Sequence, residues 1–191
     1  MGTAVITEKN MLQKETNGDD LMNPATLCLP RALEADGRAE KIREALAAST
    51  TLLWQEGNWK VPLLRVSEPL AEALQKARLQ RRVRFGFEDI AGRLAAEKKG
   101  IDALRSKLAS GSAGRVSRLL LFSSDGAQRL YRHIGQILME HRRRILGCRL
   151  DMDSRALGRL LGAENAGIKV MLVAHKDAVS DILQALVDGR E

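Results

Sequence analysis

Residues 118–123 read RLLLFS, a run that is apolar over most of its length. A second run of this kind, IKVMLVA, occupies residues 168–174. Short apolar runs without a polar alternation are typical of strands that are buried on both faces of a sheet. We therefore expect both runs to be central strands of one sheet.

The chain between and after these runs alternates between helical and strand patterns. Residues 127–144 are amphipathic, residues 145–150 (ILGCRL) have a strand pattern, and a shorter and a longer helical pattern follow. Connections of this length usually join parallel strands, so residues 116–191 are predicted to form a small three-stranded parallel βαβαβα domain. Gly147 and Arg149 on one face of the middle strand predict that this strand lies at the edge of the sheet.

Residues 68–110, upstream of this domain, read almost continuously as helix. Ser67 and Pro69 provide an N-cap hydroxyl and a first-turn proline. The pattern changes phase near residues 84–87, where the helix either bends or forms a helical hairpin. A seam of 3/4 spacing then runs through Phe87, Ile90, Leu94, Glu97, Ile101, Leu104 and Leu108. Such a seam is typical of a coiled coil, so we expect it to pack against its upstream half or to form a homo-oligomer or a contact with another protein.

The remaining segments are shorter. Residues 1–25 are predicted to be a flexible tail, and residues 26–67 a small helix followed by a hairpin. Residues 111–115 (GSAGR) are predicted to be a linker. Trp54 and Trp59 form either a stacking platform for nucleic-acid bases or, more often for such pairs, a cap on a small core. The expected fold class is therefore α/β, with a long helical or coiled-coil section before the small parallel domain.

The composition of the chain argues against several classes of protein, among them zinc-knuckle, disulfide-scaffold and membrane-spanning proteins. The chain has 191 residues, a net charge of +7 and 31 basic residues, of which 21 are arginine. Its two cysteines are too far apart in sequence for a zinc knuckle and too few for a disulfide scaffold, which predicts a reducing, cytoplasmic location. No apolar run reaches the roughly 18 residues of a membrane span, so we expect no membrane partner.

The positive charge is concentrated in two arginine clusters. One cluster lies in the helical section and the other at the end of an amphipathic helix; they comprise Arg78, Arg81, Arg82, Arg84, Arg142, Arg143 and Arg144. Arginine forks suit phosphate groups, so these residues are the candidate nucleic-acid-binding set. Two simpler explanations remain open: cations complement a helix C-terminus, and arginines pair with carboxylates of a partner helix.

Polar residues follow each predicted strand of the C-terminal domain. If all three strands are parallel, these residues share one ligand crevice, formed by Asp125, Asp151, Asp153, His175, Lys176 and Asp177. The aspartates would suit Mg²⁺, Lys176 a phosphate and His175 a proton transfer. The alternative is that Asp125, Asp153 and Asp177, each just before a helix, are ordinary N-caps, which leaves Asp151 as the one additional acid.

The functional interpretation that these patterns favour is a non-enzymatic binding or adaptor protein that contacts the backbone of RNA or DNA. One alternative is a protein–protein scaffold that assembles through the coiled-coil seam. Another is a small Mg²⁺-dependent enzyme that handles phosphate at the strand ends. The sequence contains no phosphate-binding glycine loop, dinucleotide fingerprint or nucleophile elbow, so no catalytic residue, cofactor or metal ligand is assigned.

Overall fold

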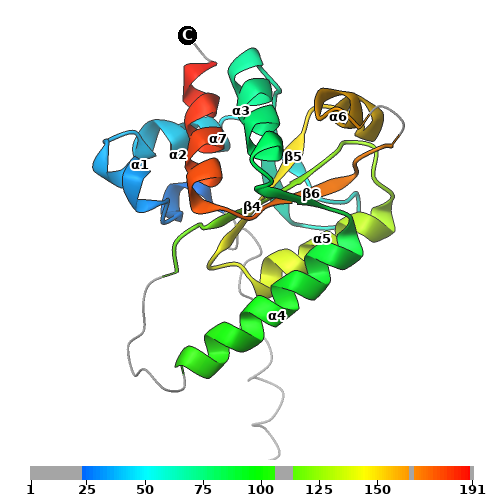
Figure 1. Cartoon of the computed structure of the whole chain (residues 1–191), viewed down its shortest axis with the longest axis horizontal. Helices are drawn as coiled ribbons and strands as arrows, with labels where there is room; N and C mark the ends of the chain where they lie inside the picture. Colours follow the sequence, from blue (N-terminus) through cyan, green and yellow to red (C-terminus); the bar gives the residue numbers. More distant parts are fainter. Residues whose placement is uncertain (1–22, 106–113, 164–165, 190–191) are drawn as a thin grey trace, which may run out of the picture.

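The computed structural model describes residues 23–105, 114–163 and 166–189. A six-stranded mixed sheet lies between two layers of helices (Figure 1), which confirms the mixed α/β class. The strand order is β1-β2-β5-β4-β6-β3. The strands are β1 (Thr50–Leu52), β2 (Lys60–Leu64), β3 (Val83–Phe85), β4 (Arg118–Phe122), β5 (Ile145–Leu150) and β6 (Val170–Val173).

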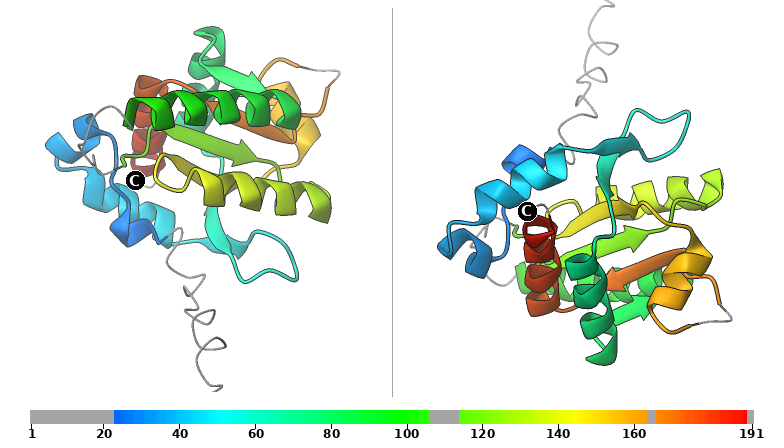
Figure 2. Two further views of the ribbon diagram at one scale, coloured as in Figure 1. Left: turned by 90° about the horizontal axis from the view of Figure 1, so that it is seen from below. Right: turned by 90° about the horizontal axis from the view of Figure 1, so that it is seen from above.

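Helices cover both faces of the sheet (Figure 2). The short helix η2 (Pro24–Thr26) leads into the first layer, which contains α1 (Arg31–Ala35), α2 (Ala39–Ala47), α3 (Glu68–Leu79), α6 (Ser154–Leu160) and α7 (Lys176–Asp188). The second layer contains α4 (Phe87–Arg105) and α5 (Gln128–Glu140). Alternate residues of β4 serve the two cores: Leu119 and Leu121 pack toward the first layer, and Leu120 and Phe122 toward the second. None of the described helices is long and apolar enough to cross a membrane.

The direction of β6 differs from the prediction. β4 and β5 are parallel, but β6 runs antiparallel to β4, with Phe122 opposite Val170 and Leu119 opposite Val173. The prediction of three parallel strands is therefore wrong. The seven-residue α6 is only about 10 Å long, so it does not carry the chain back along the sheet, and β6 enters the sheet from the end at which β4 finishes.

The position of β5 also differs from the prediction. It lies between β2 and β4 rather than at an edge, because β2 comes from a segment that we assigned to a different domain. Its two unusual residues are explained by their neighbours. Gly147 leaves room for the side chain of Leu138, and Arg149 places its guanidinium 4.4 Å from the ring centre of Tyr131 and donates to the Leu53 carbonyl at 2.7 Å.

The expected long helical section contains a strand. α3 and α4 are separated by β3, so the phase shift near residues 84–87 marks an edge strand rather than a bend or a helical hairpin. The described part of α4 packs as a surface helix on the sheet rather than as part of a coiled coil. Ile90 and Leu94 are buried there, whereas Ile101 is half-buried. Leu108 and the side chain of Leu104 lie outside the described residues.

The sheet crosses the predicted boundaries. β1 and β2 form the expected hairpin within residues 26–67, β3 comes from residues 68–110, and all join the strands of 116–191. The ring centres of Trp54 and Trp59 lie 5.4 Å apart, and both rings pack against Gly135 of α5, which is consistent with a cap on a small core. Residues 1–22 of the predicted tail and 111–113 of the predicted linker lie outside the described residues.

Candidate nucleic-acid interface

The reversed direction of β6 gathers basic residues at one end of the sheet. We call the end at which β4 and β5 begin the amino end. The segments before β3, β4 and β5 and the segment after β6 all lie there, because Val83 and Leu119 both face Val173 and Arg118 faces Ile145. These segments carry Arg81, Arg82, Arg115, Arg118, Arg142, Arg143, Arg144, His175 and Lys176.

Two of these arginines are held by one carboxylate. Glu97 of α4 lies 3.4 Å from a terminal guanidinium nitrogen of both Arg118 and Arg144. Arg93, one helical turn before Glu97, lies at the same distance through its Nε. Only 20% of the Glu97 side chain is exposed. Arg118 and Arg144 therefore attach α4 to the amino end of the sheet and are not free for a ligand.

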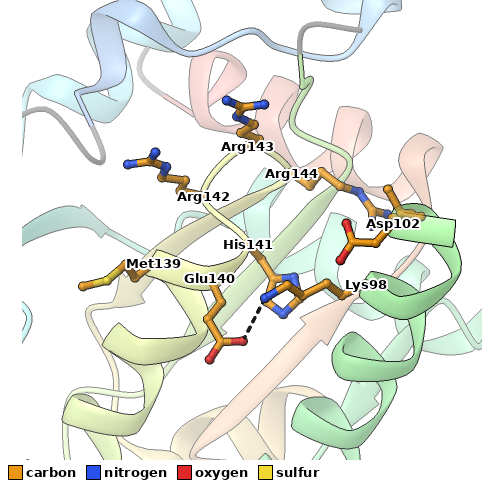
Figure 3. A pocket seen from close by; sticks show the side chains of 9 residues that line it. Lys98, Asp102, Met139, Glu140, His141, Arg142, Arg143 and Arg144 are labelled. Atoms are coloured by element: carbon orange, nitrogen blue, oxygen red, sulfur yellow. Dashed lines mark ion pairs between the residues drawn. The ribbon is translucent and has the colours of Figure 1, made fainter. Parts of the chain in front are cut away.

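The other five arginines at this end are not paired in this way; one of them, Arg115, donates to the Leu29 carbonyl at 3.1 Å. Within the described parts of the chain, Arg81, Arg82, Arg142 and Arg143 make no ion pair with a carboxylate. Arg142 and Arg143 lie on the turn between α5 and β5, are exposed, and contribute to the lining of the neighbouring cavity (Figure 3). These four side chains are the part of the predicted set that can meet a phosphate backbone.

Arg81 adopts a backbone conformation that favours glycine. Its φ is +56°, and no other described residue except glycine has a positive φ. The turn follows the end of α3, where the Arg81 N–H donates to the Arg78 carbonyl at 2.8 Å and the Arg82 N–H to the Ala77 carbonyl at 2.9 Å. Glycine is the usual residue at such a helix end. An arginine there costs about 1 kcal/mol of backbone strain, which is a physical reason to look for a role of its side chain.

A cavity of about 230 Å³ lies beside the 141–144 turn, between α4 and α5. Lys98 and Glu140 form an ion pair of 3.7 Å across it, and Asp102 lies on the α4 side (Figure 3). The ring of His141 lies among these groups. Burial lowers the pKa of His141; Lys98 and Arg144 lower it further, although Glu140 and Glu97 oppose the shift. His141 is therefore neutral at pH 7, and the positive charge of this region comes from lysine and arginine.

The predicted ligand crevice is divided between the two ends of the sheet. Asp125, Asp151 and Asp153 follow β4 and β5 at the carboxyl end. His175, Lys176 and Asp177 follow β6, whose reversed direction places them at the amino end. The described residues contain no group of three metal-ligating side chains. The structure thus does not bring the six residues together.

Most of these residues have structural partners. Asp153 caps α6 by accepting the Ala156 N–H at 2.7 Å, which confirms the N-cap interpretation for this residue. Asp125 accepts the backbone N–H of Ser154 at 2.9 Å and its hydroxyl at 2.7 Å. Although burial opposes ionisation, hydrogen bonds from Ser123 and Ser154 hold the pKa of Asp125 below its ordinary value.

The remaining crevice residues differ from the expected caps. α7 is capped by His175, whose Nδ1 accepts the Asp177 N–H at 3.3 Å, and not by Asp177. Asp151 is exposed, and its backbone N–H donates to the Leu64 carbonyl at 2.9 Å. Lys176 is exposed in the first turn of α7. The backbone hydrogen bond of Asp151 thus joins the carboxyl ends of β2 and β5.

Of the other two predicted arginines, one lies within a strand and the other within a helix. Arg84 is exposed in the middle of β3. Arg78 donates to the Gly162 carbonyl at 3.4 Å, beside the loop that follows α6. The sequence interpretation did not identify Glu97 as the anchor of Arg118 and Arg144. The one available signal was its position as the only acidic residue in an apolar seam.

No model of a known protein family matches the chain, and no curated protein matches it with significance. The function that the geometry supports must therefore be argued from the residues themselves.

Proposed function

We propose that the protein is a non-enzymatic binding protein that contacts the phosphate backbone of RNA or DNA through the amino end of its sheet. The observation that carries this proposal is the gathering of Arg81, Arg82, Arg142 and Arg143 at one end of the molecule without carboxylate partners in the described chain. Two pairs of adjacent arginines that are far apart in sequence offer forked donors that suit phosphate oxygens.

Contacts to the backbone are favoured over base recognition. Single-stranded bases are usually read by stacking on exposed aromatic rings. Trp54 and Trp59 instead pack against Gly135 of α5, while Phe85 is the last residue of β3 and Phe87 the first residue of α4. We therefore expect affinity that depends strongly on salt and only weakly on nucleotide sequence.

The test replaces the free arginines and measures binding to mixed-sequence RNA and DNA over a range of salt concentrations. In Arg142→Gln/Arg143→Gln, the salt slope should fall by about one unit for each lost phosphate contact, equally for all sequences. The matched control is Arg155→Gln/Arg159→Gln, which removes two exposed arginines of α6 at the other end of the sheet. This control should bind as the unmodified protein does.

A second variant separates binding from folding. Arg81→Gly removes a candidate phosphate contact and relieves the positive φ at this position. It should weaken nucleic-acid binding while leaving the free energy of unfolding equal or higher. If the unmodified protein binds neither RNA nor DNA at low salt, the proposal fails. An acidic protein surface would then be the partner to test for the same arginines.

A further inference from the structure

A second cavity lies at the carboxyl end of the sheet, the opposite end from Arg142 and Arg143. It has a volume of about 510 Å³ and opens where β3 ends and β6 begins. Its walls are mostly apolar and come from Phe85, Phe87, Leu130, Ile168 and Val170. Pockets for small organic ligands have this size and this kind of lining.

The charge of the cavity has one sign. Arg78 and Lys169 contribute to its lining, and none of the described residues that line it is acidic. Within the described chain neither cation has a carboxylate partner. The Arg78 guanidinium is held in place by the Gly162 carbonyl at 3.4 Å, which leaves most of its donors unused. A mostly apolar cavity with two cations that have no carboxylate partner among the described residues is complementary to an anion that has an apolar body.

Two features keep the walls of the cavity defined and its interior accessible. The ring of Phe87 packs against the ring of His133, with 5.6 Å between the ring centres. Gly86 has a φ of +85°, and a Cβ atom built on it would meet nothing within 4 Å. The glycine therefore turns the chain between the two aromatic residues without filling the space beside them.

We propose that this cavity binds a small amphipathic organic anion. The apolar body of the ligand lies against Phe85, Phe87 and Ile168, and its acidic group binds Arg78 and Lys169. Carboxylates, sulfonates and phosphate monoesters share this chemistry. The site is separate from the proposed nucleic-acid interface and does not depend on it.

The test uses two fluorescent probes with the full chain. Anilinonaphthalene sulfonate is an amphipathic anion, and phenylnaphthylamine is its uncharged analogue. The sulfonate should bind saturably at one site, and its affinity should exceed that of the uncharged probe by at least roughly 10-fold, because only the sulfonate forms charge-assisted hydrogen bonds with the two cations. Lack of saturable binding, or equal affinity for the two probes, would overturn the proposal.

Variants then locate the site. Arg78→Gln/Lys169→Gln should weaken sulfonate binding roughly 10- to 100-fold and leave the uncharged probe unaffected. Arg78→Lys retains the charge and should retain most of the affinity. The control Arg142→Gln/Arg143→Gln should bind the sulfonate as the unmodified protein does, which distinguishes this site from the amino end of the sheet. Unchanged affinity in the first variant would show that the probe binds elsewhere and would refute the assignment.

Discussion

Glu97 holds α4 against the amino end of the sheet through Arg118 and Arg144. In the sequence it interrupts an apolar seam, and the seam suggests a coiled coil. In the structure it faces the sheet and lies within 3.4 Å of three arginines. Arg118 and Arg144 come from the two central strands of the sheet or the turn before them. The acidic residue therefore fixes the position of α4 on the sheet instead of weakening a helix pair.

We predict that Glu97→Gln destabilises the protein by about 1–3 kcal/mol, because it leaves the partly buried Arg118 and Arg144 without a counter-charge. The measurement is the free energy of unfolding in urea. Glu72→Gln, a change of the same chemistry at an exposed position of α3, should alter it by less than about 0.5 kcal/mol. Equal effects of the two substitutions on the free energy of unfolding would mean that the ion pairs of Glu97 with the arginines do not stabilise the protein.

At the scale of elements, the positions of buried strands and amphipathic helices were predicted better than the directions of the strands. RLLLFS is apolar on both faces, and it became the strand β4 between the two cores. The amphipathic segment over 127–144 became α5, and Ser67 and Pro69 correctly marked the start of α3. The direction of β6 was not predictable in this way, because a side-chain pattern repeats every two residues whichever way a strand runs.

The arrangement of the candidate site residues could not be predicted from the sequence for the same reason. The seven arginines were visible as clusters, but the placement of Arg81 and Arg82 at the same end of the sheet as residues 142–144 depends on the reversed β6 and on the pairing of β3 with it. The six crevice residues were grouped on the assumption of parallel strands, and the reversal separates them. β3 was missed because three residues, Val83–Phe85, are too short to interrupt a helical pattern visibly.

The seam of α4 gives a prediction at this scale. Leu94 is 2% exposed in the core between α4, α5 and the sheet. Leu94→Ala should therefore reduce the free energy of unfolding by about 2–5 kcal/mol. Ile101→Ala, on the same helix but only half-buried, should cost less than about 1 kcal/mol. Thermal or urea unfolding at several protein concentrations checks both values; a concentration-dependent midpoint would instead favour the homo-oligomer that the seam suggested.

At the scale of the whole molecule, the sheet joins segments that the sequence suggested were separate. β2 pairs with β5, β3 pairs with β6, and the core of the first layer includes Ile42, Leu46, Leu70 and Leu74 from the first half of the chain. A fragment of residues 114–191 would lose the pairing of β2 with β5 and of β3 with β6. It would also lose many of the helices that cover the two faces of the sheet.

We therefore predict that the fragment 114–191 does not unfold cooperatively, although its pattern of elements resembles a complete domain. Circular dichroism during urea titration measures this, since the slope of the transition scales with the surface that unfolding exposes. The full chain should show one steep transition. A fragment with a steep transition of its own, at a stability within about 1 kcal/mol of the full chain, would contradict this view and restore the boundary at residues 111–115.

The position of β3 also has a consequence for how the protein is made. Among the described strands its one neighbour is β6, and 84 residues separate Phe85 from Val170. At roughly 5–20 residues per second, a ribosome needs about 4–17 s to synthesise that interval. During this time β3 has no partner strand, and neither, once β4 has been made, does the edge of β4 that β6 will occupy. The newly made chain must therefore wait, partly unpaired, for its last strand, and in this interval it is most exposed to chaperones and to aggregation.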